Sequence, residues 1–576
     1  MSELSHPVVD PAWVAWKDPD VVEFFNPTEL LLDRHIAQNA DSIALSIDGI
    51  HYTYAELLGH VNRGANALNA SGLRPGERVL LFGIDSLEYV SIWLGALRLG
   101  AVPVAVADAY RAQNLRYFIE DTGARILAID GEQLAKFNEI AAELPSSLSL
   151  VLIRPAEDSG DAETRIGQAG PPRKNVLNLL ADSSDRFEPV QVHKHDVAYM
   201  FYSGGTTGTA KGIPHLAQDF HIVPERQAAV WKTTAKDVTH ATSKKFFSHG
   251  IWPGLLIPLY TGGRAVLTRK PPTPEHLINL IETEKPSGLI TVPTVIKNLL
   301  SYVEANGRTF DFSSIKLAVT ASEKIPPEIF ERFHAIFGIE LLDAIGNSEV
   351  TYSWLCNTPS NFKRGSLGRP TYGVTIKLVG RDGQTITNPN TAGEAYVHSV
   401  TAAPFYWRKQ KQSLATFNGG WTRTGDELWF DEDGFYWFSG RANDLFKVKG
   451  LWVSPIEVEA EITSHPAVYE AAVIPHESAD GLTESRAFVV LKPGHKASED
   501  LTAELQAKIK RNIGGYKVPQ SIIYPSTLPR TTLMKIDRRA LRDLKVGQGT
   551  DHAASPPVSV EAAAKRAQAL DTPSSQ

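Results

Sequence analysis

The sequence predicts an α/β protein with a large N-terminal domain of mostly parallel sheets flanked by helices, a β-rich subdomain and a small α+β C-terminal domain. First, apolar strand-like runs alternate with helical patterns from Leu30 to Ala344, which is typical of parallel sheets covered on both faces. Second, shorter β-like runs with glycine turns replace this alternation after Thr371. Third, helix and strand patterns mix again between about Ala442 and Leu544.

The first part of the chain contains a helix with clear ends. Ser86 can act as the N-cap of a helix that continues to Leu99, and Gly100 can end it. Further along, the apolar run Val197–Phe201 predicts a buried strand that opens into a loop. The other strands predicted in this part are Arg78–Phe82, Ala101–Ala105, Arg125–Asp130 and Leu148–Ile153.

Polar loops directly follow several predicted strands. Pro293 can open a helix after one of the strands in the second part of the chain. These strands are Arg264–Thr268, Gly288–Val292, Ile315–Thr320 and Ile339–Ala344. Ligands of open α/β sheets bind at the carboxyl ends of strands. We therefore expect one composite site at a sheet edge, formed by the loops Tyr202–Gly212, Ala321–Lys324 and Ile345–Glu349.

The C-terminal part has its own pattern. Ser454, Pro455 and Glu457 fit the N-cap, N1 and N3 positions of a capping box, and apolar residues at helical spacing from Leu501 to Ile513 predict an amphipathic helix. We expect domains at 1–441 and 442–546, and a disordered tail at 547–576 because it lacks a core-forming pattern. The β-like runs after Thr371 are Val374–Val379, Glu394–Ser399, Gly434–Ser439, Val468–Ile474 and Ala487–Leu491.

The composition argues against several classes of protein. The 576 residues are 43% hydrophobic and 21% charged, which is globular, and a net charge of −7 argues against nucleic-acid binding. Cys356 is the single cysteine, and the usual zinc-binding spacings are absent. Glycine, arginine and proline interrupt the most apolar stretch, Val90–Val106, so we expect no membrane span there. No signal-peptide pattern begins the chain, and we expect a soluble cytoplasmic protein.

The loop Tyr202–Gly212 has the composition of a polyphosphate-binding loop. Its glycines let the backbone approach a ligand and present N–H groups, and Lys211 adds a positive charge. Hydroxyl donors come from Ser203, Thr206, Thr207 and Thr209. The loop is not a Walker A motif, because Lys211 follows alanine and precedes glycine. Taken alone, it is equally consistent with a surface turn.

This loop resembles the phosphate loop of the adenylate-forming enzymes, which include acyl- and aryl-CoA ligases. Further matching motifs follow in the family's order: Gly346–Glu349, Gly365–Pro370, Trp421–Asp426, Gly440–Arg441 with Asp444 and Lys447, and Leu528–Lys535. Together they cover the chain from about Asn26 to Asp543. Within the family, Lys245–Gly250 and Lys447–Pro455 are most similar to the benzoate-CoA ligases and related aryl-acid ligases.

The resemblance implies a two-step reaction that uses ATP, Mg²⁺ and coenzyme A. A carboxylate attacks the α-phosphorus of ATP to give an acyl-adenylate and pyrophosphate, and CoA then takes the acyl group and releases AMP. Lys535 would be the catalytic cation of the first step, and Glu349 both a catalytic residue and the metal ligand. ATP would be bound by Ser203, Gly204, Gly205, Thr206, Thr207, Gly208, Lys211, Ser322, Glu323, Asp343, Ala344, Ile345, Gly346, Asn347, Ser348, Asp426, Phe438 and Arg441.

The resemblance also implies a pocket for a small aromatic acid and a mobile C-terminal domain. The pocket would be lined by Phe246, Phe247, His249, Gly250 and Tyr352, although either phenylalanine alone is equally consistent with a core residue. Asn443 would be the hinge, and Lys449 and Gly450 would line the CoA tunnel. Two positions depart from the family: Asn443 replaces the usual Asp or Lys, and Met534 replaces the glycine before Lys535.

Two other functions remain open at this stage. The adenylate could pass to the thiol of a carrier protein instead of CoA, although the chain has no fused carrier domain. A nucleotide-binding pseudoenzyme would explain the departures at Asn443 and Met534. A serine hydrolase is disfavoured, because neither Ser203 nor Ser348 lies in a Gly-x-Ser-x-Gly motif.

Overall fold

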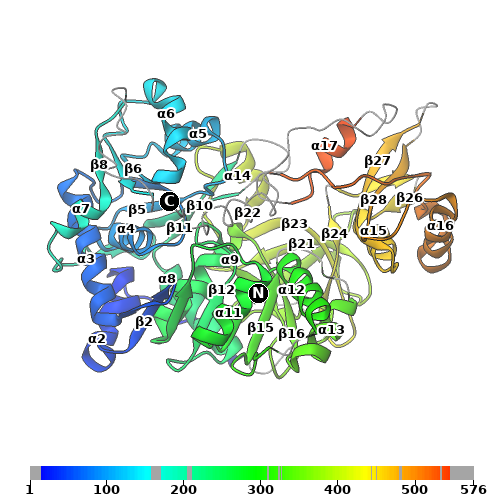
Figure 1. The fold of residues 1–576 in the computed structure, drawn as a ribbon, viewed down its shortest axis with the longest axis horizontal. Coiled ribbons are helices and arrows are strands. Elements are labelled where there is room, and N and C mark those ends of the chain that lie inside the picture. The colour runs from blue at the N-terminus through cyan, green and yellow to red at the C-terminus, as the bar shows by residue number, and fades with distance from the viewer. Residues whose placement is uncertain are drawn as a thin grey trace, which may run out of the picture. The chain divides into compact units, whose positions relative to one another are not determined.

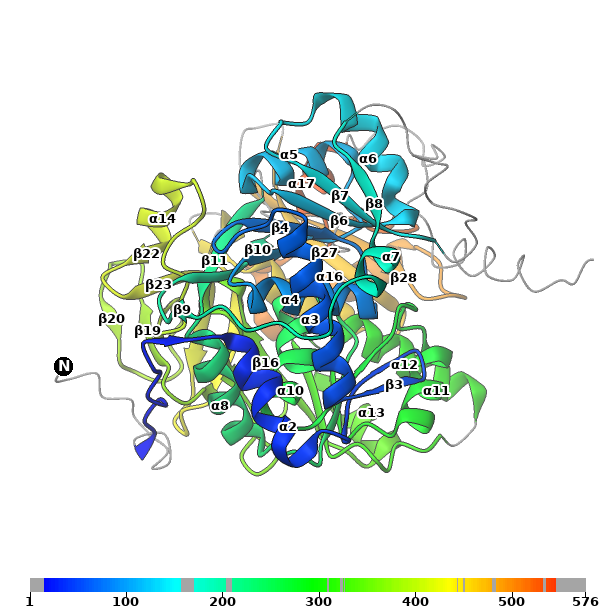
Figure 2. The ribbon, with the colours of Figure 1, turned by 90° about the vertical axis from the view of Figure 1, so that its left-hand side faces the viewer.

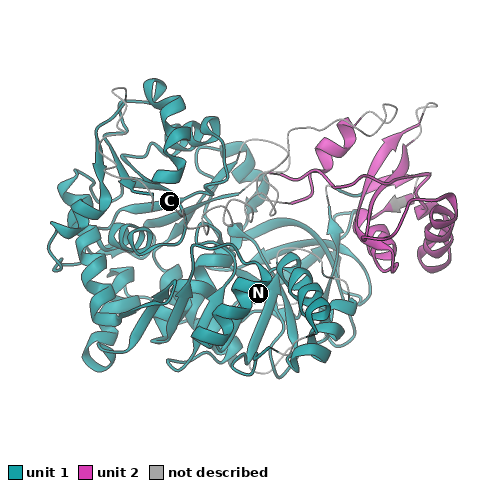
Figure 3. Ribbon diagram, viewed as in Figure 1, with its two compact units in different colours: residues 1–445, 532–534 teal, residues 446–531, 535–576 magenta. Residues whose placement is uncertain are grey.

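The computed structural model describes residues 15–156, 170–203, 210–307, 310–321, 325, 327–442, 444–448, 451–478, 483–531 and 535–544. Two compact units are present: Met1–Leu445 with Thr532–Met534, and Phe446–Thr531 with Lys535–Gln576 (Figure 3). The predicted tail at 547–576 lies outside the described residues. Within those residues, no helix combines the length and hydropathy that crossing a membrane requires.

The first unit contains a seven-stranded sheet with the order β11-β10-β5-β4-β6-β7-β8. All its neighbouring strands run parallel except β10 and β11, which form an antiparallel pair at one edge. Its strands are β4 (Arg78–Phe82), β5 (Val102–Ala105), β6 (Ile126–Asp130), β7 (Leu150–Arg154), β8 (Arg173–Asn175), β10 (Val197–Ser203) and β11 (Lys211–Leu216).

A nine-stranded sheet follows, with the order β18-β17-β16-β15-β14-β12-β13-β2-β3. Its six central strands, from β16 to β2, are parallel, and antiparallel strands flank them at both edges. Figure 1 shows α11, α12 and α13 in front of it, and their apolar residues form one cluster with β14, β15 and β16. The strands are β2 (Ile43–Ile47), β3 (Ile50–Thr53), β12 (Val238–Ala241), β13 (Arg264–Leu267), β14 (Gly288–Thr291), β15 (Leu317–Ala321), β16 (Leu341–Gly346), β17 (Ser353–Cys356) and β18 (Arg369–Pro370).

The predicted α/β class is therefore confirmed, with shifted strand ends. For example, β15 begins at Leu317 rather than Ile315. The predicted N-cap is also present, because the Ser86 hydroxyl accepts from the Tyr89 amide at 3.1 Å. The main helices of this unit are α2 (Arg34–Asn39), α3 (Tyr54–Ala70), α4 (Leu87–Arg98), α5 (Ala112–Thr122), α6 (Leu134–Ile140), α7 (Val176–Ala181), α8 (Asp219–Trp231), α9 (Ser248–Ile251), α10 (Ile257–Thr261), α11 (Pro274–Glu284), α12 (Pro293–Asn306), α13 (Pro327–Phe337) and α14 (Gln410–Thr416).

Helices α3 and α4 join the two sheets. They pack along each other, while α3 contacts β2 and β3 of the larger sheet and α4 contacts β4 and β5 of the smaller one (Figure 2). Two glycines allow this close approach. A Cβ atom on Gly64 would lie 2.1 Å from the carbonyl oxygen of Ser91, and one on Gly95 would lie 2.7 Å from the backbone nitrogen of Ala65.

We expect the substitution Gly64→Ala to destabilise the first unit by about 1–3 kcal/mol or more, because the added methyl group collides with backbone that cannot rotate away. Gly59→Ala on the same helix is the matched control. Its Cβ would lie 3.8 Å from that of Asp185, and alanine favours helix by up to about 1 kcal/mol. Urea denaturation measures both. Equal stability of the two variants would contradict the close helix contact.

The β-rich subdomain lies at the end of the first unit. Its sheet has the order β20-β19-β21-β23-β22, with β24 paired to β23. Alternate residues of β23 are buried, as expected for a sheet with one covered face. The strands are β19 (Thr375–Val379), β20 (Thr385–Ile386), β21 (Gly393–His398), β22 (Phe417–Asn418), β23 (Trp421–Phe430) and β24 (Tyr436–Arg441).

The second unit is a three-stranded sheet, β27-β28-β29, with helices on both faces. The predicted amphipathic helix is α16. The predicted capping box is wrong: Ser454 is the N-cap of α15, but its side chain makes no capping bond, and Glu457 instead accepts from Lys517 Nζ at 2.6 and 2.7 Å. The elements are β25 (Phe446–Val448), β26 (Leu451–Val453), α15 (Pro455–Thr463), β27 (Val468–Glu477), β28 (Thr483–Leu491), α16 (Glu499–Ile513), β29 (Ser521–Ile523) and α17 (Arg538–Asp543).

Candidate active site

The Gly/Thr loop connects the antiparallel strands β10 and β11. Ser203 and Lys211 are register partners, so the two ends of the loop lie opposite each other. Gly204, Gly205, Thr206, Thr207, Gly208 and Thr209 lie outside the described residues. The expectation of one sheet edge is wrong, because this loop leaves the seven-stranded sheet, whereas β15 and β16 belong to the nine-stranded sheet.

One tyrosine nevertheless brings the two sheets' polar groups together. Lys211 Nζ lies 4.3 Å from the ring centroid of Tyr406, and the Tyr406 hydroxyl donates to Glu349 Oε1 at 2.8 Å. Burial and the Glu349 carboxylate raise the pKa of Tyr406, so its hydroxyl stays protonated and able to donate. Lys211 at the ring and Glu349 at the hydroxyl thus contact the same tyrosine.

The segment Gly346–Val350, which we call the Glu349 turn, has an ordered backbone. A Cβ on Gly346 would lie 2.3 Å from the carbonyl oxygen of Tyr352, which explains why glycine stands there. Asn347 Oδ1 accepts from the Val350 amide at 3.1 Å and closes the turn. Ser348 and Glu349 are therefore presented on a short, capped turn directly after β16.

The carboxylate chemistry of this site fits Mg²⁺. The described residues contain no group of three or more His, Cys, Asp or Glu that could hold a metal ion. Mg²⁺, however, usually binds through one or two carboxylates together with waters and substrate phosphates. A single carboxylate, Glu349, bonded to the tyrosine that Lys211 also contacts, matches that pattern.

The residues expected around adenine and ribose lie on β16, β23 and β24. Asp343 is buried on β16, and this burial raises its pKa. Its Oδ1 accepts from the Ala344 amide at 2.9 Å, and Ile345 follows on the same strand. Asp426 and Arg441 are register partners, with Arg441 Nε 3.0 Å from Asp426 Oδ1. Phe438 is half-buried on β24. Ser322 and Glu323 lie outside the described residues.

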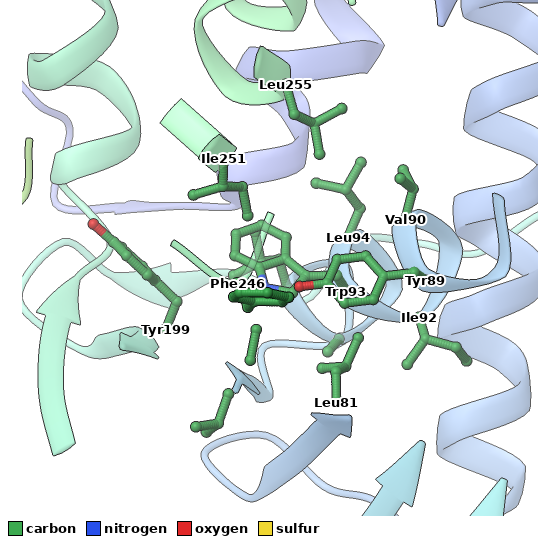
Figure 4. Packing of buried hydrophobic residues seen from close by; sticks show 14 of the residues in the cluster. Leu81, Tyr89, Val90, Ile92, Trp93, Leu94, Tyr199, Phe246, Ile251 and Leu255 are labelled. Carbon is green, nitrogen blue, oxygen red and sulfur yellow. The ribbon is translucent and has the colours of Figure 1, made fainter. Parts of the chain in front are cut away.

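The two phenylalanines expected in the acid pocket differ in their surroundings. Phe246 belongs to the main apolar cluster, part of which Figure 4 shows. Phe247 is half-buried, and its ring packs on that of Phe246 with 4.7 Å between centroids. Gly250 is required by close packing, because its Cβ would lie 2.0 Å from the carbonyl oxygen of Lys244.

His249 and Tyr352 form an aromatic cluster with Trp231. The rings of His249 and Tyr352 stack at 6.2 Å, and Trp231 meets Tyr352 edge-on at 6.2 Å. His249 Nε2 donates to the Thr291 carbonyl at 3.0 Å, since a carbonyl only accepts, and burial lowers the histidine pKa. The imidazole is therefore neutral near pH 7, with Nδ1 as an acceptor.

Lys535 is held by backbone contacts within the second unit. The Thr531 amide donates to the Lys535 carbonyl at 2.7 Å, and Arg530 and Ile536 form an antiparallel bridge. Leu528, Leu541 and Ile536 pack against one face of the sheet. The Lys535 side chain is exposed. Asn443, Lys449, Gly450 and Met534 lie outside the described residues.

Sequence reasoning missed three residues of this region. Tyr406 lies within the aromatic run Phe405–Trp407, which was a signal that we did not use. His215 follows Lys211 by four residues on β11 and reaches the Glu349 turn, and Trp231 at the end of α8 completes the aromatic cluster. Neither has a motif of its own in the sequence.

Comparisons with known proteins agree with this arrangement. Residues 32–407 match the family model of the AMP-binding enzyme, and residues 457–535 match that of the AMP-binding enzyme C-terminal domain. The chain is 33% identical to a benzoate–CoA ligase of Thauera aromatica, over 91% of this chain and 96% of that protein. It is 31% identical to a 4-hydroxybenzoate–CoA/benzoate–CoA ligase of Rhodopseudomonas palustris, over 92% of this chain and 97% of that protein.

Solved structures are similar as well. The anthranilate CoA ligase AuaEII, in complex with anthranoyl-AMP, superposes with a TM-score of 0.83 at 31% identity, over 92% of this chain and 98% of that one. A benzoate CoA ligase from Burkholderia xenovorans LB400 superposes with a TM-score of 0.80 at 30% identity, over 90% of this chain and 100% of that one.

Proposed function

We propose that this chain, which belongs to the AMP-binding enzyme family, activates a small aromatic carboxylic acid with ATP and transfers it to coenzyme A. The observation that carries the proposal is the shared contact with Tyr406: Lys211, at the end of the Gly/Thr loop, lies at its ring, and Glu349 accepts from its hydroxyl. A phosphate-binding cation and a metal-binding carboxylate are the two charges that a bound MgATP requires close together.

Each group of the site then has a defined task. Bound MgATP supplies the α-phosphate that the acid attacks, and CoA supplies the thiol that takes the acyl group. Lys211 and Ser203 hold phosphate oxygens at the loop ends, and Glu349 holds the metal ion. The Asp426 carboxylate accepts from the ribose hydroxyls, with Arg441 beside it. Positioning and charge neutralisation of this kind are the main contributions of such a site.

The aromatic cluster supports a flat acid as substrate. His249, Tyr352 and Trp231 present stacked and edge-on rings, which favour an aromatic ring over a long flexible chain. The neutral His249 imidazole places no positive charge beside the acid. The similar ligases named above act on benzoate, hydroxybenzoate and anthranilate, and we propose a substrate of the same class for this chain.

Pyrophosphate release with a panel of acids tests the proposal. Benzoate and its hydroxy and amino derivatives are expected to release pyrophosphate with ATP and Mg²⁺, and to yield the CoA thioester when CoA is added. A long-chain fatty acid is the control and is expected to be inactive. Acid-dependent AMP formation without a thioester would favour a carrier-protein acceptor, and no acid-dependent turnover would favour the pseudoenzyme.

A further inference from the structure

A buried histidine links the strand that leaves the Gly/Thr loop to the Glu349 turn. His215 lies on β11, four residues after Lys211, and its side chain is fully buried. Its Nε2 donates to the Ser348 carbonyl at 2.7 Å. Its Nδ1 lies 3.2 Å from Oδ2 of Asp219, the first residue of α8, which is also buried. Ser348, the residue before Glu349, is thus bonded to His215, and the second ring nitrogen of this histidine lies beside Asp219.

The backbone on the other side of the turn is strained. Thr351 has φ 74° and ψ −59°, and the Tyr352 amide donates to the Val350 carbonyl at 2.9 Å across it. This is the rare γ-turn of positive φ, which is unfavourable for a β-branched residue. Such conformations are energetically costly and persist where the surroundings enforce them, most often at functional sites.

The same histidine takes part in holding that strained residue. The Thr351 hydroxyl lies 3.1 Å from His215 Nδ1 and 3.3 Å from Asp219 Oδ2, and it donates to the Thr401 carbonyl. His215 therefore contacts the Glu349 turn through the carbonyl of Ser348, and the residue that follows the turn through the hydroxyl of Thr351. Glu349, whose carboxylate we assign to the metal, stands between Ser348 and Thr351 in the chain.

We infer that His215 is a positioning residue for Glu349, and that it fixes the separation between the phosphate-binding strand β11 and the metal-binding turn. This inference rests on the proposed function. A buried histidine bonded to a carbonyl is often purely structural. Here, however, its bond ends within the metal-binding motif and its ring supports the strained residue beside that motif, so its loss is expected to act on Mg²⁺-dependent steps selectively.

Substitution by glutamine or asparagine distinguishes the contributions of the two ring nitrogens of His215. His215→Gln can still place an N–H near the Ser348 carbonyl, whereas the shorter side chain of His215→Asn cannot. The matched control is His240→Gln. His240 is another buried histidine, whose Nδ1 donates to the Val266 carbonyl at 2.9 Å in the nine-stranded sheet, away from the Glu349 turn.

For His215→Asn we expect the Mg²⁺ concentration at half-maximal pyrophosphate release to rise roughly 10–100-fold, the usual effect of losing a residue that orients a metal ligand. Calorimetry should show that Mg²⁺ raises the ATP affinity of the variant much less than that of the wild type. The ATP affinity in EDTA should be the same for both. Thioester formation from a supplied acyl-adenylate, which involves no pyrophosphate, should be unchanged. His215→Gln should remain within a few-fold of wild type, and His240→Gln should match wild type in all three measurements.

Two outcomes would overturn the inference. One is an unchanged Mg²⁺ dependence in a folded His215→Asn variant, and the other is an equal loss of both half-reactions, which is the mark of a general structural defect. If His215→Asn does not fold, the Mg²⁺ dependence of His215→Gln is measured instead. A shift as large as the one expected for His215→Asn would then also contradict the inference. Failure of wild-type protein to release pyrophosphate with any acid would contradict the proposed function alone, because Mg²⁺-dependent ATP binding tests His215 independently.

Discussion

Replacing Lys535 by alanine is expected to slow adenylate formation about 100–1000-fold, the usual effect of removing one charge-stabilising contact from a transition state. Negative charge accumulates where the carboxylate meets the α-phosphate, and an ammonium group neutralises it. Lys535 is exposed, and its backbone is fixed by the Thr531 bond and by the bridge between Arg530 and Ile536. Acid-dependent pyrophosphate release measures the effect.

The second half-reaction provides the discriminating comparison for Lys535. Thioester formation from a supplied acyl-adenylate and CoA should proceed at the wild-type rate, because no phosphoryl charge develops in that step. Lys510→Ala, which removes an exposed lysine from α16 of the same unit, is the control and should leave both steps unchanged. Equal losses in both half-reactions would contradict the assignment of Lys535 to adenylation.

The second large effect is expected from Asp85→Ala, which should destabilise the first unit by about 3–5 kcal/mol, because it leaves a buried ammonium without its carboxylate. Lys245 has no exposed side-chain surface, and its Nζ lies 3.2 Å from Asp85 Oδ2. Asp85 Oδ1 also accepts from the Lys245 amide at 3.0 Å, so the carboxylate orients the backbone that leads into Phe246.

Urea denaturation followed by tryptophan fluorescence measures this loss, since every tryptophan except Trp452 belongs to the unit that contains Asp85. Asp185→Ala is the control. It breaks an exposed pair with Arg63, 3.8 Å apart, and surface pairs of this kind contribute about 0–1 kcal/mol. A loss for Asp85→Ala as small as that of the control would show that Lys245 finds another partner or reaches water.

Sequence patterns predicted the secondary structure correctly where the interactions that stabilise it join residues close together in the chain. The helix that begins after Ser86 and the amphipathic helix α16 are present, because capping and hydrophobic periodicity act over a few residues. The capping box at Ser454 failed for the opposite reason: Glu457 is bonded to Lys517, sixty positions away in the chain, and that charged partner replaces the local bond. Local propensity therefore decided an element only where no distant side chain competed.

The sequence by itself determined the α/β class, the order of the motifs and the residue types of the site, because glycine-rich turns, caps and alternating apolar runs are properties of short segments. Only the tertiary structure decided which of these segments meet. It assigned the Gly/Thr loop and the Glu349 turn to different sheets, and joined them through Tyr406 and His215. Those contacts bridge 57 and 133 positions of chain, a distance over which packing, rather than local pattern, determines which atoms lie together.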